Sequence, residues 1–132
     1  MVIAKQLSVF LANKPGVLAR LCDSLAEHDI NIMAISVSDT VDHAVVRMVL
    51  SDPRKAMDVF ESHNMLVVET DVLLVPVPDK PGQLARVSRR LAKAKVNIEY
   101  AYGSSSSNGG RDAFLVVRVN DIAKAKKALQ GN

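Results

Sequence analysis

The sequence predicts an α+β protein made of two tandem copies of one small unit. Two observations lead to this class: a stretch of sequence recurs, and strand-like and helix-like segments alternate in the same order within each copy. The recurring stretches, NKPGVLARLCDSLAEHDINI at 13–32 and DKPGQLARVSRRLAKAKVNI at 79–98, agree at ten of twenty positions without a gap. We therefore interpret the chain as a duplication, with units at residues 1–69 and 70–132.

The first copy is expected to contain four strands and two helices. Runs rich in β-branched residues between turn residues mark the strands, and apolar residues three or four apart mark the helices. Pro15 is expected at the first helical position, and Asp52 before Pro53 is a typical N-cap. The expected segments are strand 6–12, a helix beginning at Pro15, strands 31–38 and 43–50, a helix from Pro53 to about His63, and strand 65–68.

The second copy repeats this order but has no fourth strand of its own. Its expected segments are strand 71–77, helix 81–94, strands 96–102 and 113–119, and helix 121–130. Strand 65–68 could pair in either sheet. The order βαββαβ, with antiparallel sheets and the helices on one face, is the ferredoxin-like arrangement. Many unrelated functions use that fold, so the fold alone identifies none.

Composition limits the classes of protein to which this chain can belong. The chain is 48% apolar and 23% charged, with a single cysteine, Cys22. No apolar run approaches the roughly 20 residues that span a bilayer, and the first residues do not have the pattern of a secretory signal. We therefore expect a cytoplasmic protein without a membrane partner.

Charge is distributed unequally between the copies. Residues 1–66 carry a net charge of −2 and residues 67–132 a net charge of +5. A basic helix face is usually solvated surface, so we expect no nucleic-acid partner. Binding to a nucleic acid or to an acidic protein is the less favoured alternative. The basic residues concentrated here are Lys80, Arg86, Arg89, Arg90, Lys93 and Lys95.

The duplicated loops 13–18 and 79–84 each lead from a strand into a helix. Free N–H groups and the dipole at a helix N-terminus favour an anion, and glycine allows it to approach closely. Such a site accepts a carboxylate, and the preceding Asn13 or Asp79 could accept a hydrogen bond from an ammonium group. The loops therefore suit a zwitterion. The alternative is an ordinary capped turn at a helix start.

The pattern strand–[Asn/Asp]-Lys-Pro-Gly-x-Leu-Ala-Arg–helix–Asn-Ile–strand resembles the ACT domain, a small regulatory module attached to many enzymes of amino-acid metabolism. The resemblance covers nearly the whole chain as two copies. It implies an amino-acid ligand at the interface between the units, contacted by the loop of one unit and by the asparagine of Asn-Ile from the other. It also implies a regulatory or sensor role, allosteric and without catalysis. The resemblance further implies, as a partner, an enzyme of amino-acid metabolism on a separate chain.

Two sites that are not equivalent follow from this resemblance. The first would combine Asn13, Gly16, Val17 and Leu18 with Asn97, and the second Asp79, Gly82, Gln83 and Leu84 with Asn31. Some serine-responsive members have a histidine two residues before the loop asparagine. Leu11 and Val77 stand there in this chain, which argues for a more apolar or different ligand.

Other chemistries are disfavoured. His28, His43, His63 and Cys22 lack the spacing of a metal site or an activated nucleophile, so we expect no enzyme, metal or cofactor. Tyr100, Tyr102 and Phe114 could stack on bases in an RNA-binding relative of this fold, but the motif around them is missing. Strands apolar on both faces predict a homodimer or larger homo-oligomer. The alternative function is an interaction module or orphan regulatory subunit that binds no ligand.

Overall fold

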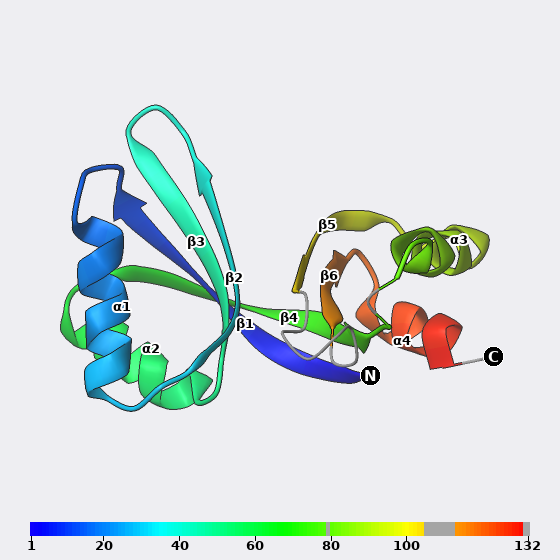
Figure 1. The fold of residues 1–132 in the computed structure, drawn as a ribbon, viewed down its shortest axis with the longest axis horizontal. Helices are drawn as coiled ribbons and strands as arrows, with labels where there is room; N and C mark the ends of the chain where they lie inside the picture. Colours follow the sequence, from blue (N-terminus) through cyan, green and yellow to red (C-terminus); the bar gives the residue numbers. More distant parts are fainter. Residues whose placement is uncertain (79, 105–112, 131–132) are drawn as a thin grey trace. The chain divides into compact units, whose positions relative to one another are not determined.

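A computed structural model describes residues 1–78, 80–104 and 113–130. Strands and helices follow one another in the predicted alternating order (Figure 1). The predicted α+β class, with two ferredoxin-like βαββαβ units, is confirmed. The elements are β1 (Val2–Ala12), α1 (Val17–Glu27), β2 (Ile32–Asp39), β3 (His43–Leu50), α2 (Pro53–Ser62), β4 (Leu66–Pro76), α3 (Gln83–Lys93), β5 (Ile98–Ser104), β6 (Phe114–Val119) and α4 (Ile122–Gln130).

The first compact unit comprises Lys5–Thr70. Its strands are ordered β2-β3-β1-β4, and β3 pairs antiparallel with both β1 and β2. The strand predicted at 65–68 belongs to this unit, because the first part of β4 falls within it.

The second compact unit combines Asp71–Asn132 with Met1–Ala4. Its strands are ordered β1-β4-β6-β5, and β6 pairs antiparallel with both β4 and β5. No strand follows α4 among the described residues. The beginning of β1 takes the position of the missing fourth strand, beside β4. Met1 also packs against the core of this unit.

Each unit has its own core between the sheet and its two helices. In the first unit the alternate residues Leu7, Val9 and Leu11 of β1 face the same cluster as Leu21 of α1 and Phe60 of α2. In the second unit Leu73 and Val75 of β4 meet Leu91 of α3 and Ala125 of α4. The period of two along a strand and about 3.6 along a helix places these side chains on one face.

Several predicted boundaries differ from the structure, among them the start of α1, the start of β1 and the extent of β4. Pro15 precedes α1 instead of starting it, because Gly16 at the N-cap has φ 85°, which no continuing helix can contain. β1 begins at Val2, four residues earlier than predicted. The predicted strands 65–68 and 71–77 form one strand, β4, since the polar residues between them fit an extended backbone.

Exposed apolar side chains gather on β2, which is an edge strand of the first unit. Met33 is 42% exposed, Ile35 41% and Val37 50%. The prediction placed the exposed apolar surface on the open face of the sheet. On that face Ala34 and Val49 are buried, whereas Phe10 of β1 is 37% exposed. Contact of the open face with another chain stays a prediction, and β2 adds further exposed apolar side chains.

Candidate functional site

The first duplicated loop ends in a helix start that has no side-chain cap. Gly16 is the N-cap of α1 in the left-handed conformation, and no side chain accepts a hydrogen bond from the first turn. Within the described residues, the N–H groups of Leu18 and Ala19 have no hydrogen-bond partner. These N–H groups lie at the positive end of the α1 dipole. The loop is therefore able to bind a carboxylate through its backbone.

Asn13 is held by its backbone and leaves its side chain available. Its N–H donates to the carbonyl of Asp42 at 3.2 Å, which ties the end of β1 to the β2–β3 turn. The residue is exposed, and its side-chain amide makes no hydrogen bond to any other described residue. An amide can both donate and accept, so Asn13 can contact either end of a zwitterion.

Arg20 is a functional candidate that the sequence did not single out. Its Nη1 lies 3.5 Å from the position that a Cβ atom would occupy on Gly16. The guanidinium group therefore lies beside the Gly16 turn and adds a full positive charge to the partial charge of the helix start. Its recurrence as Arg86 in the second copy is the sequence signal that could have identified it as a candidate.

The second loop repeats the left-handed glycine N-cap but differs in its side chains. Gly82 is the N-cap of α3 with φ 91°, again without a side-chain cap. The N–H groups of Leu84 and Ala85 have no partner within the described part of the chain. Arg86 Nε donates to Gln83 Oε1 at 3.3 Å, and nothing lies within 4 Å of a Cβ position on Gly82. Asp79 lies outside the described residues.

The two asparagines of the Asn-Ile pairs are fixed in the same way. The N–H of Asn31, just before β2, donates to Ser51 Oγ at 2.9 Å, and the N–H of Asn97, just before β5, donates to Asn120 Oδ1 at 3.0 Å. Both asparagines are exposed, and neither side chain hydrogen-bonds to another described residue. Each is therefore free to contact a ligand.

No single unit brings its own loop and its own asparagine together. Gly16 precedes α1 and Asn31 follows it, and this 11-residue helix is about 16 Å long. α3 separates Gly82 from Asn97 in the same way. A site that uses both features needs a loop from one copy and an asparagine from the other, and that pairing stays a prediction.

Metal and membrane signals are absent from the described part of the chain. Its His, Cys, Asp and Glu side chains form no cluster of three or more that could hold a metal ion. His28 and His63 each place Nδ1 2.8 Å from a backbone carbonyl in the preceding helical turn. No helix there is both long and apolar enough to cross a bilayer.

Comparisons with known proteins agree with this architecture. The chain matches the family model for the ACT domain pair over residues 1–132. Comparison with curated proteins gives no significant match. Among solved structures, it is similar to protein BT0572 from Bacteroides thetaiotaomicron, with 34% identity, a TM-score of 0.89, and coverage of 97% of this chain and 87% of that one.

More distant structures share the fold. The ligand-free regulatory subunit of aspartate kinase from Thermus thermophilus is 15% identical, with a TM-score of 0.68 and coverage of 98% of this chain and 94% of that one. The corresponding subunit from Thermus flavus is 18% identical, with the same TM-score and coverage. Because the family model spans the whole chain, this protein belongs to the ACT domain pair family.

Proposed function

We propose that this protein is a regulatory sensor that binds a free amino acid and has no catalytic activity of its own. The observation that carries the proposal is the duplicated, uncapped helix start. At Gly16 and again at Gly82, a left-handed glycine exposes backbone N–H groups that no described side chain caps. Membership of the ACT domain pair family supports the same conclusion.

The proposed first site joins Asn13, Gly16, Val17 and Leu18 to Asn97, and the second joins Asp79, Gly82, Gln83 and Leu84 to Asn31. In the first site the ligand carboxylate would bind the free N–H groups of α1 beside Arg20, and Asn13 would accept from the ammonium group. Leu18 is 38% exposed and Leu84 50%, so each loop offers an apolar contact for the ligand side chain. We expect an apolar amino acid in preference to serine.

A thermal-shift screen of the twenty amino acids tests ligand binding. A ligand at 100 times its dissociation constant should stabilise the fold by about 2.7 kcal/mol. That stabilisation raises the midpoint by several degrees in a domain of this size. If no amino acid shifts the midpoint, the sensor proposal is wrong and the interaction module is favoured.

Asparagine variants test the site. Asn97→Ala should weaken the first site about tenfold and Asn31→Ala should weaken the second to the same extent, because each removes hydrogen bonds to a charged ligand group. The two variants serve as each other's control in calorimetric titration, since each should leave one class of site intact. Unchanged binding in both would reject the pairing of loops with asparagines.

We further propose that the protein acts in the cytoplasm as a homodimer or larger homo-oligomer. The apolar β2 edge, with Met33, Ile35 and Val37 exposed, supports a second chain there. The same edge also supports the second candidate function, an interaction module that contacts an enzyme of amino-acid metabolism. A monomeric mass by light scattering at micromolar concentration would contradict the oligomer.

A further inference from the structure

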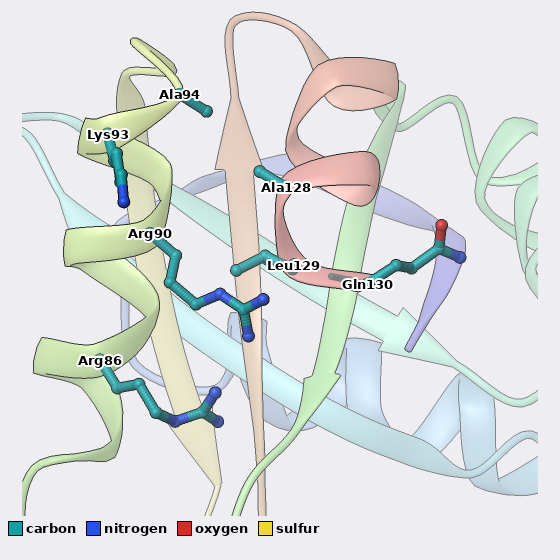
Figure 2. Close-up of a pocket in the computed structure, with 7 residues that line it drawn as sticks. All are labelled: Arg86, Arg90, Lys93, Ala94, Ala128, Leu129 and Gln130. Atoms are coloured by element: carbon teal, nitrogen blue, oxygen red, sulfur yellow. The ribbon is translucent and has the colours of Figure 1, made fainter. Parts of the chain in front are cut away.

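A groove in the second unit lies between α3 and α4 and is distinct from the duplicated loops. Its volume is about 840 Å³, which is within the range of small-molecule sites. One wall is basic, with Arg86, Arg90 and Lys93 from α3. The other wall comes from α4 and combines the apolar Ala128 and Leu129 with the uncharged Gln130 (Figure 2).

The three cations form a row along one side of α3. Residues four and three positions apart stack on the same helix face, so the row extends over about 10 Å. In Figure 2 the side chains of Arg86 and Arg90 extend from α3 toward α4, and Lys93 lies on the same wall. An anion in the groove would therefore meet several positive charges at once.

No carboxylate neutralises this row within the described residues. Arg86 donates to the uncharged Gln83, and neither Arg90 nor Lys93 forms an ion pair there. Like charges four residues apart on a helix destabilise it. The dipole of α3 favours Arg90 and Lys93 in the last turn, but not Arg86. A bound anion would relieve this repulsion.

The equivalent groove of the first unit demonstrates that the fold does not require these charges. That groove, of about 410 Å³, is lined by Arg20, Asp23, Ser24, Glu27, His63 and Met65. Through the shift of 66, Ser24 corresponds to Arg90 and Glu27 to Lys93. The basic row is therefore specific to the second copy.

We propose that the α3–α4 groove binds an organic polyphosphate, such as a nucleoside di- or triphosphate. Arginine matches the geometry of phosphate oxygens, and a row about 10 Å long exceeds what one phosphate can neutralise. The apolar side chains of Ala94, Ala128 and Leu129 can pack against the organic part of the ligand. A volume of about 840 Å³ accommodates a small molecule of this class.

Calorimetric titration with ATP at low ionic strength tests the proposal, using variants that borrow residues from the first copy. Arg90→Ser and Lys93→Glu should each weaken ATP binding about tenfold. Arg89→Asp is the matched control. It reverses one positive charge, as Lys93→Glu does, and introduces the aspartate that the first copy has at the equivalent position 23. Position 89 does not line the groove. It should weaken binding by less than about threefold, because its charge lies outside the groove and makes no direct contact with the ligand.

Two further ligands separate the phosphates from the organic part. Inorganic triphosphate should bind more weakly than ATP, and adenosine should not bind. The proposal is overturned if ATP fails to bind the unmodified protein, or if Arg89→Asp is as harmful as Lys93→Glu. It is also overturned if triphosphate binds as tightly as ATP. Circular dichroism of each variant verifies that the fold is retained.

Discussion

The glycines of the two duplicated loops have nearly the same backbone conformation and different surroundings. Gly16 has φ 85° and ψ −13°, and Gly82 has φ 91° and ψ −3°. The arginine four residues later is the same in both copies, yet Arg20 lies beside its glycine whereas Arg86 hydrogen-bonds to Gln83. Gln83 offers a carbonyl oxygen, and the equivalent Val17 offers none. One neighbouring substitution thus redirects a retained side chain.

The helix grooves differ in the same manner. Both copies pack two helices on a sheet, but the groove of the first unit contains Asp23 and Glu27 and that of the second contains Arg90 and Lys93. Surface charge can change without disturbing the core, because the core residues lie on the other face of each helix. The comparison indicates that the copies retained their scaffold and diverged in what they bind.

The largest expected effect tests whether the two cores are equivalent. Leu25 and Leu91 occupy matching positions, and each is 1% exposed. Leu25→Ala and Leu91→Ala should each lower the free energy of unfolding by about 3 kcal/mol, because each leaves a cavity in a packed core. Urea denaturation measures this loss. A loss below about 1 kcal/mol in either variant would contradict equal packing.

Glycine substitutions should have an intermediate effect. Gly16→Ala and Gly82→Ala should each lower the free energy of unfolding by about 1–2 kcal/mol, because both positions have left-handed φ. A Cβ would meet only the Arg20 side chain at Gly16, at an ordinary 3.5 Å, and nothing at Gly82. The two losses in a thermal melt should therefore be similar. A much larger loss at Gly16 would indicate that Arg20 cannot move aside.

The smallest expected effect concerns the later helix of each unit. Asp52 and Asp121 each accept a hydrogen bond from the backbone three residues later, both at 3.1 Å. Asp52→Ala and Asp121→Ala should each lower the free energy of unfolding by about 1 kcal/mol, whereas asparagine at either position should retain most of the cap. Guanidinium denaturation compares the four variants. If alanine and asparagine behave alike, the cap has no role.

The sequence predicted most of the elements because their signals are local. Val17, Leu21 and Leu25 recur at helical spacing, and Asp52 before Pro53 marks a helix start that the structure confirms. Pro15 was misplaced because proline and glycine both suit a helix start, and only the positive φ of Gly16 decides where α1 begins. The position of the Arg20 side chain could not be predicted either, because its χ angles depend on neighbouring residues that differ between the two copies of the motif.

The sequence by itself determined the duplication, the βαββαβ order of the first copy and the recurrence of the loop residues. Periodicity and turn chemistry are properties of short stretches, so a single chain reveals them. Only the tertiary structure decided that β4 is one strand and that Met1–Ala4 belongs to the second unit. It also decided that α3 and α4 enclose a basic groove. These features depend on pairing between residues that are far apart in the sequence. Burial and backbone hydrogen bonding fix that pairing only when the whole sheet forms.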